Sequence, residues 1–201
     1  MMASIGVPSL YRKYRLSDFR LRTNPAECFT GGALDWSHSG FLLRGTYGEG
    51  KSCFAGAMIR SMLHPNAPAG IVELVDNYTG KKSWQYRPDS VRWWHASDLS
   101  NWILDESFAG RRKSMYEELL RPRLIVVDDY GKERMNTDVV REAMVVAIEK
   151  FTSWGKFLIV TTNLATDEAL AAHEGSISSR LNNLVEIILP PLDRRGSFKG
   201  E

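Results

Sequence analysis

The sequence predicts an α/β fold in which helices flank a five-stranded, mostly parallel sheet. Short apolar, β-branched runs alternate with helical patterns along the chain, which is typical of strand–helix units. Two of these runs are almost continuously apolar, as expected for strands that are covered on both faces. No repeat, linker or low-complexity tract divides the 201 residues, so we expect a single domain over residues 1–201.

The composition is that of an ordinary globular protein. Hydrophobic residues make up 43% and charged residues 25%, and a net charge of +2 does not by itself indicate nucleic-acid binding. The two cysteines, Cys28 and Cys53, fit neither a disulfide framework nor a metal-binding spacing. Since no signal-peptide pattern and no apolar run of membrane-spanning length occurs, we predict a cytoplasmic protein.

Strand and helix patterns follow one another in a regular order. Helical spacing of apolar residues runs from Lys51 until Pro65 and again from Val140 to Phe151. The five predicted strands are Gly40–Arg44, Val91–His95, Arg123–Asp128, Phe157–Thr162 and Val185–Leu189.

The segment 71–87 breaks this order. Strand-like residues flank Asn77–Lys81, a turn-forming run that contains Asn and Gly. The pattern predicts a β-hairpin that stands apart from the main sheet.

A glycine-rich loop gives the first functional signal. Residues Gly45–Ser52 match the phosphate-binding pattern GxxxxGK[ST] and lie between a predicted strand and a predicted helix, as that pattern requires. Backbone N–H groups of such a loop cradle phosphate oxygens, Lys51 would reach the β- and γ-phosphates, and the Ser52 hydroxyl would bind Mg²⁺. The sequence therefore predicts a nucleotide site with ATP and Mg²⁺ as cofactors.

The predicted nucleotide-binding segment extends one residue past the motif. Within it, we expect Tyr47 and Cys53 to pack or to face solvent. The segment consists of Gly45, Thr46, Tyr47, Gly48, Glu49, Gly50, Lys51, Ser52 and Cys53.

Polar residues close the two most apolar strands. Asp128 and Asp129 stand at the end of one strand, and Asn163 follows the other. A carboxylate there can hold Mg²⁺, a second one can orient or deprotonate an attacking water, and an amide can contact the γ-phosphate. Such turns are common, but their combination with the phosphate-binding loop favours a functional interpretation.

The order and spacing of these motifs resemble the AAA+ ATPases, and within them the DnaC-type helicase loaders and IstB-type transposase helpers. The segments that carry the resemblance are Gly45–Ser52, Leu124–Gly131, Leu158–Leu164 and Ile177–Leu181. The resemblance implies a P-loop NTPase core of the AAA+ type.

The same resemblance implies a role for each matching residue. Asp128 takes the place of the Mg²⁺-binding carboxylate, together with Ser52, and Asp129 that of the catalytic carboxylate. Asn163 matches the residue that senses the γ-phosphate, and Arg180 matches an arginine finger that a neighbouring subunit inserts into the nucleotide site. A planar cation stabilises charge on a transferring phosphoryl group, so we expect a homo-oligomer in which Arg180 acts in trans.

Compared with the family, the core is expected to be reduced. Only 44 residues precede Gly45, so the N-terminal docking module that such loaders and helpers usually carry is expected to be missing. Too few residues follow Arg180 for the C-terminal lid domain of many AAA+ proteins, which this family often lacks as well. Residues 1–30 are expected to form an N-terminal arm that leads into the core, 71–87 an inserted hairpin, and 190–201 a short basic tail. In that tail Arg194 or Arg195 would replace a lid arginine, or the tail is simply solvated.

The implied function is ATP hydrolysis in DNA replication, by a helicase loader that acts as an oligomer on DNA. A transposase helper is the neighbouring alternative, and a replicative helicase or a transposase is the corresponding partner. A P-loop kinase for small molecules and a non-hydrolysing, nucleotide-gated scaffold are two further alternatives.

Basic residues are candidates for contact with single-stranded DNA, against the alternative of a solvated basic face. The four histidines, His38, His64, His95 and His173, lack ligand spacing, and we expect structural or surface roles for them. The candidate DNA contacts are Arg111, Arg112, Lys113, Lys132 and Arg134.

Overall fold

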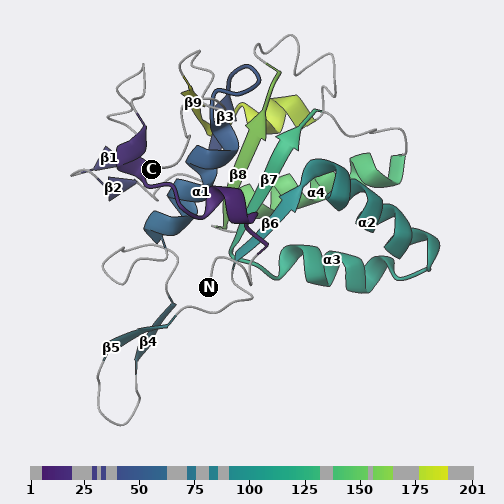
Figure 1. Ribbon diagram of the computed structural model, residues 1–201. Helices are drawn as coiled ribbons and strands as arrows, with labels where there is room; N and C mark the ends of the chain where they lie inside the picture. Colours follow the sequence, from purple (N-terminus) through teal and green to yellow (C-terminus); the bar gives the residue numbers. More distant parts are fainter. Residues whose placement is uncertain are drawn as a thin grey trace.

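The computed structural model has a parallel sheet at its centre, with helices on both faces (Figure 1). The structure describes residues 6–19, 29–30, 33–34, 40–62, 72–75, 82–85, 91–131, 138–153, 156–164 and 177–189. None of the helices in these ranges is long and apolar enough to cross a membrane.

The central sheet has five strands in the order β6-β7-β8-β3-β9. Every neighbouring pair is parallel, which confirms the predicted sheet and makes it wholly rather than mostly parallel. The strands are β3 (Gly40–Arg44), β6 (Val91–His95), β7 (Leu124–Tyr130), β8 (Phe157–Thr162) and β9 (Val185–Ile188).

One strand differs from its predicted bounds in an informative way. β7 does not end at Asp128 but continues to Tyr130. Val127 pairs with Val160 and Tyr130 with Thr162, so one extra residue is accommodated between these pairs. The resulting bulge keeps the ladder going beyond the two acidic residues, and polarity alone does not reveal it.

Alternating side chains of the strands build two separate cores. One core lies beneath α1 (Lys51–Met62) and the short 3₁₀ helices η1 (Ser9–Tyr11) and η2 (Leu16–Asp18). The other lies beneath α2 (Ala96–Phe108), α3 (Arg112–Leu120) and α4 (Asp138–Ser153). The consecutive residues Trp93 and Trp94 contribute to opposite cores, as their alternation along a strand predicts.

Two small antiparallel pairs lie outside the central sheet. Strands β4 (Val72–Val75) and β5 (Lys82–Gln85) form the predicted hairpin, with Val72 opposite Gln85. The other pair, β1 (Phe29–Thr30) and β2 (Ala33–Leu34), was not predicted, since strands of two residues carry no measurable periodicity.

Phe54 provides a test of how α1 is anchored to the sheet. Its side chain is 1% exposed, and its ring meets that of Phe19 edge-on at 5.0 Å. Because truncation removes a large buried ring and leaves a cavity, we expect Phe54→Ala to lower the free energy of unfolding by about 3–5 kcal/mol. Urea unfolding measures this loss. The matched control is Phe108→Ala, where the ring is 84% exposed and a change below about 0.5 kcal/mol is expected. Equal losses in both variants would contradict the assigned packing.

Candidate nucleotide-binding site

The glycine-rich loop connects the end of β3 to the first turn of α1. Gly50 has φ +88°, a left-handed conformation that glycine adopts without steric cost, and its carbonyl accepts the Phe54 N–H that opens the helix. The Lys51 Nζ, on a side chain that is 5% exposed, donates to the carbonyls of Gly45 at 2.8 Å and Thr46 at 2.7 Å. The lysine that the motif assigns to phosphate contact is therefore held inside the loop.

Glu49 turns inward on the loop that carries it. The side chain is only 4% exposed, and its carboxylate accepts hydrogen bonds from the backbone N–H and the hydroxyl of Thr46. These two hydrogen bonds connect Thr46 and Glu49 within the loop through a buried acidic side chain. Two other members of the predicted segment lie nearer to solvent: Tyr47 is exposed and Cys53 is partly buried, in agreement with expectation.

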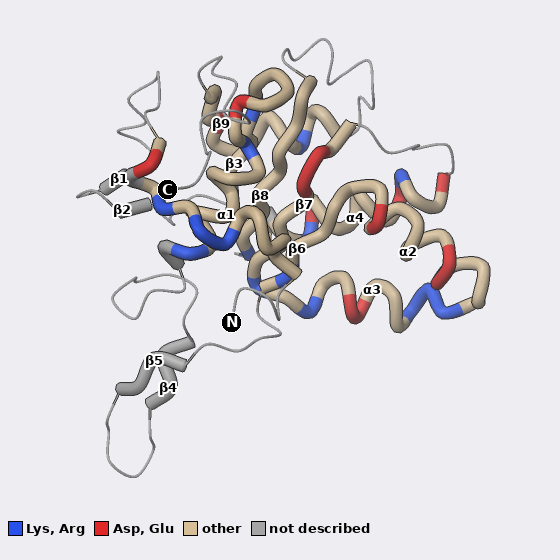
Figure 2. The backbone as a smooth tube through the Cα atoms, in the orientation of Figure 1, with Lys and Arg blue, Asp and Glu red and all other residues tan. Residues whose placement is uncertain are grey.

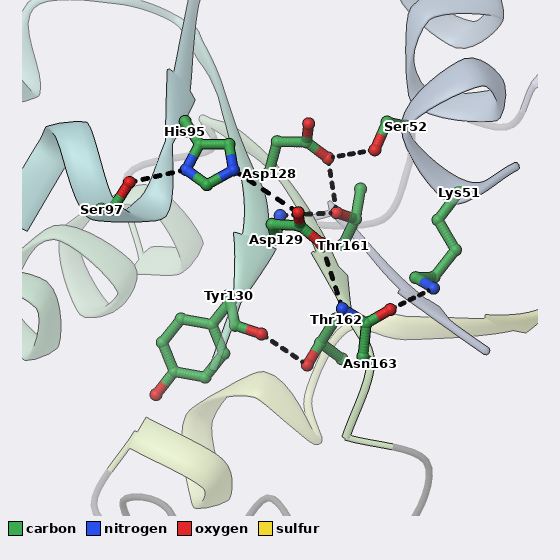
Figure 3. A network of polar contacts seen from close by, with 10 residues as sticks. All are labelled: Lys51, Ser52, His95, Ser97, Asp128, Asp129, Tyr130, Thr161, Thr162 and Asn163. Carbon is green, nitrogen blue, oxygen red and sulfur yellow. Dashed lines mark hydrogen bonds and ion pairs between the residues drawn. The ribbon is translucent and has the colours of Figure 1, made fainter. Parts of the chain in front are cut away.

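Asp128 occupies the centre of the site, two residues before the end of β7. Its Oδ1 accepts a hydrogen bond from the Ser52 hydroxyl at 2.7 Å and another from the Thr161 hydroxyl at 2.6 Å (Figure 3). Burial raises the pKa of Asp128, and these two hydrogen bonds oppose that rise. Nearby charges act in opposite directions on the same pKa, since Asp129 raises it and His95 lowers it.

The donor set fits a magnesium ion. The Ser52 hydroxyl and the Asp128 carboxylate are hard oxygen ligands that the fold already brings within hydrogen-bond distance. Among the described residues, no group of three or more His, Cys, Asp or Glu side chains is arranged to hold a metal. Two protein ligands supplemented by phosphate oxygens and waters are the usual arrangement for Mg²⁺, so Ser52 and Asp128 would hold it here.

Asp129 adopts a backbone conformation that is rare outside glycine. Its φ is +63°, at the bulge where Asp128 and Asp129 together oppose Thr161. The hydroxyl of Thr161 accepts the Asp129 N–H at 2.8 Å while it donates to Asp128, so one buried side chain orders both acidic residues. A strained backbone at a carboxylate is a recognised feature of catalytic sites.

Asn163 links the two ends of the polar network. Its Oδ1 accepts a hydrogen bond from Lys51 Nζ at 2.6 Å, and its Nδ2 donates to Asp129 Oδ1 at 3.1 Å. The phosphate-binding lysine and the second carboxylate are thus joined through one amide. The predicted residues Lys51, Ser52, Asp128, Asp129 and Asn163 all lie in this network (Figure 3).

His95 was expected to be structural or on the surface, but the structure places it in the site. Its Nε2 lies 3.4 Å from Asp129 Oδ2, and its Nδ1 lies 2.8 Å from the hydroxyl of Ser97 at the start of α2 (Figure 3). A signal was present in the sequence, because His95 ends a predicted strand. In a parallel sheet the ends of neighbouring strands meet at one edge, where His95 is in register with Asp128.

Tyr11 is a second residue that the sequence analysis did not connect with the site. A Cβ atom at Gly56 would lie 2.7 Å from the Tyr11 carbonyl oxygen, so only glycine lets η1 approach α1 this closely. Burial raises the pKa of the Tyr11 hydroxyl, and the charge of Asp128 raises it further, while a hydrogen bond with Ser52 acts in the opposite direction. The N-terminal arm therefore reaches the proposed magnesium ligands.

The remaining predicted residues within the described ranges have partners of their own. Arg180 forms an ion pair with Glu149 of α4 at 3.5 Å. Arg111 pairs with Glu106 and Arg112 donates to Ser107 across the turn between α2 and α3, where basic and acidic segments adjoin (Figure 2). Lys113 lies 3.9 Å from Glu117 within α3. The residues outside the described ranges are Lys132, Arg134, Arg194 and Arg195.

Comparison with known family models and with curated protein sequences gives no match. Solved structures do match. The DnaC helicase loader has a TM-score of 0.64 at 17% sequence identity, over 91% of this chain and 100% of that one. DnaI has a TM-score of 0.65 at 16% sequence identity, over 92% of this chain and 96% of the DnaI chain. The chain has the AAA+ ATPase fold.

A third AAA+ structure extends the comparison to replication initiators. The initiator DnaA, bound to AMPPCP and single-stranded DNA, has a TM-score of 0.61 at 12% identity over 92% of this chain. This chain spans about half of the DnaA chain, 51% of its length. The resemblance to DnaC-type AAA+ cores is thereby confirmed for the fold.

Asp128 allows a test of the site without an activity assay. Because its pKa is raised by burial, the ionised side chain destabilises the folded protein at high pH. This cost decreases as the pH falls below the folded pKa and is gone below the unfolded pKa. Asparagine is neutral at every pH and still accepts hydrogen bonds at Oδ1. Without nucleotide, we expect Asp128→Asn to raise Tm at pH 8 and to raise it less as the pH is lowered. A lower Tm for Asp128→Asn than for the wild-type protein at pH 8 would contradict the buried position assigned to Asp128.

The same variant separates stability from metal binding. In the presence of a non-hydrolysable ATP analogue, we expect added Mg²⁺ to raise the Tm of the wild-type protein further, because the Mg²⁺-nucleotide complex binds only the folded state. Asp128→Asn should lose the Mg²⁺-dependent part of this gain. The control is Asp138→Asn, since this side chain is 97% exposed at the start of α4 and should leave the gain intact.

Proposed function

We propose that the chain is an ATP-hydrolysing accessory protein of DNA replication, of the helicase-loader type, that acts as an oligomer on DNA. One observation carries the proposal: the phosphate-binding loop and three strand ends contribute to a single polar network on a fold shared with DnaC and DnaI over nine-tenths of the chain. Two carboxylates beside a phosphate-binding loop are what magnesium binding and water activation require, which supports the proposal.

The chemistry follows from the positions of these side chains. Loop amides and Lys51 would bind the β- and γ-phosphates, while Ser52 and Asp128 would hold Mg²⁺, which neutralises charge on the phosphate oxygens. Asp129 would orient the attacking water and accept its proton. Asn163, which contacts both Lys51 and Asp129, is placed to report the γ-phosphate to the catalytic carboxylate.

The proposal of an oligomer rests on Arg180. Its guanidinium forms an ion pair with Glu149 on α4 at 3.5 Å. About a third of its side chain is exposed, and its place in the motif Ile177–Leu181 matches an arginine that acts on the site of a neighbouring subunit. We infer that Arg180 stabilises the transferring phosphoryl group in the site of an adjacent subunit, where a second cation would be most effective.

Arg180→Ala tests this inference. We expect ATP turnover to fall by about 10³-fold or more, while the affinity for an ATP analogue stays within about twofold, because an arginine finger acts mainly in the transition state. The matched control is Arg141→Ala, which removes another partly exposed arginine and its ion pair with Asp138 on α4. Unchanged turnover in Arg180→Ala would exclude the trans mechanism.

In the wild-type protein, ATP turnover per protomer should rise with protein concentration and rise further with single-stranded DNA.

The turn between α2 and α3 is the proposed contact with single-stranded DNA. Phe108 is 84% exposed at the end of α2, and Lys113 is 93% exposed one turn later. An exposed aromatic ring beside cations combines base stacking with attraction to phosphate, which is how single strands are bound without sequence preference. In Figure 1 this turn stands out from the body on the β6 side of the sheet.

Phe108→Ala is expected to weaken binding of a fluorescent single-stranded oligonucleotide by about 1–3 kcal/mol, the value of one stacked base. Lys113→Ala should instead reduce the slope of log affinity against log salt by about 0.7, the loss of one phosphate contact. Leu10→Ala provides the control, since Leu10 is 59% exposed on η1. If all three variants bind alike, the DNA contact lies elsewhere.

Partner identity separates the remaining alternatives. Binding to a replicative helicase supports the loader, and binding to a transposase supports the helper. Turnover that stays constant per protomer and ignores DNA would favour a small-molecule kinase, for which phosphoryl transfer to an added nucleoside is the direct assay. Measurable steady-state turnover would exclude a scaffold that binds ATP without hydrolysis.

A further inference from the structure

Arg44 is a buried cation that the nucleotide chemistry does not use. It is the last residue of β3, directly before the phosphate-binding loop, and it is 5% exposed. Its neighbour two residues earlier, Leu42, packs in the core beneath α2 and α4. Since side chains alternate along a strand, Arg44 points toward the same face.

The turn that carries Arg180 packs on this face. Three apolar residues of the segment, Ile177, Leu181 and Leu184, are buried in the same core as Leu42. The segment then continues into β9, which pairs with β3 and closes with a hydrogen bond from the Leu189 N–H to the Arg44 carbonyl at 3.0 Å. The backbone of Arg44 is therefore one attachment point of this segment.

The Arg44 side chain provides a second attachment. Its Nε lies 2.9 Å from Oε1 of Glu186 on β9, and its Nη2 donates to Oδ1 of Asn182 at 3.4 Å. Asn182 lies two residues after Arg180, in a turn closed by hydrogen bonds from Asn182 N–H to Ser178 O and from Asn183 N–H to Arg180 O. The Arg44 guanidinium thus contacts Asn182 just after Arg180 and Glu186 on β9, at the two ends of the segment that joins Arg180 to the sheet.

A buried guanidinium is costly to desolvate and is not needed for packing alone, because an apolar side chain of similar size would fill the same space. A planar cation can, however, restrain two partners at once. Here Nη2 donates a hydrogen bond to Asn182, whereas Nε meets Glu186 as an ion pair without hydrogen-bond geometry. Arg44 therefore gives the Arg180 turn a fixed position relative to β3.

We propose that Arg44 is a positioning residue for the arginine finger: it holds the turn over residues 177–184 so that Arg180 reaches the nucleotide of a neighbouring subunit. This inference rests on the proposed action of Arg180 in trans. It assigns Arg44 a role in the subunit that donates the finger and none in the subunit that binds the nucleotide, although Arg44 adjoins the phosphate-binding loop of its own chain.

Mixed oligomers distinguish these two roles. An Asp129→Asn chain keeps Arg180 but cannot hydrolyse ATP, and serves as donor of the finger. An Arg180→Ala chain keeps its own site and serves as acceptor. Any ATP turnover that mixing restores takes place in the nucleotide site of the acceptor, because the donor supplies the Arg180 that this site lacks. Arg44→Met is then introduced into the donor or into the acceptor.

In the donor, Arg44→Met is expected to lower the restored turnover by about tenfold or more, because a displaced cation loses transition-state contact. In the acceptor, the same substitution should leave restored turnover within about twofold. Melting temperature and ATP-analogue affinity of each chain establish that folding and nucleotide binding are retained. Glu186→Gln in the donor is a milder variant, since Glu186 is 42% exposed, and it should also lower the restored rate.

The possible failures are distinct. If donor and acceptor chains with Arg44 intact do not restore turnover, the action of Arg180 in trans is wrong, and this inference is overturned with it. If they do, and both the Arg44→Met and the Glu186→Gln donors restore it fully, only the role of Arg44 is overturned. Equal losses in donor and acceptor would likewise overturn it, because Arg44 would then act through its own phosphate-binding loop or fold.

Discussion

The parallel direction of all five central strands is the constraint on which the site depends. Parallel pairing brings the carboxyl ends of β6, β7, β8 and β3 to one edge of the sheet, so residues far apart in sequence meet there. Lys51 and Asn163 are separated by 112 positions, and their side chains lie 2.6 Å apart. A sheet with a reversed strand would remove one of the contributors from this edge.

Within that edge, the bulge in β7 determines the geometry of the acidic pair. In regular pairing the side chains of Asp128 and Asp129 would point to opposite faces of the sheet. The extra residue and the positive φ of Asp129 instead let the Thr161 hydroxyl bond to both residues, while Asp129 also reaches Asn163 and His95. The strained backbone of Asp129 therefore accompanies the contacts through which we propose that it activates water.

Local motifs made much of the fold and site predictable from the sequence. The loop through Lys51 and the strand-end residues Asp128 and Asn163 were identified because their chemistry follows from neighbouring residues. His95, Tyr11 and Arg44 were not, because each acquires its contacts from another strand or helix and has an ordinary local pattern. The extension of β7 to Tyr130 was missed for a related reason: a bulge depends on the partner strand, and polarity at Asp128 suggested an end.

The central strand β3 connects two segments whose proposed functions belong to different subunits. Its end leads into the phosphate-binding loop, one neighbour, β8, leads to Asn163, and the other neighbour, β9, follows the turn with Arg180. A displacement of the loop by bound nucleotide would therefore act on a strand that also holds the finger segment through Arg44. Because packed cores resist continuous deformation, such a displacement would move β3 and β9 together. In the proposed oligomer, nucleotide bound by one subunit would in this way alter the position of the Arg180 side chain that the subunit offers to its neighbour.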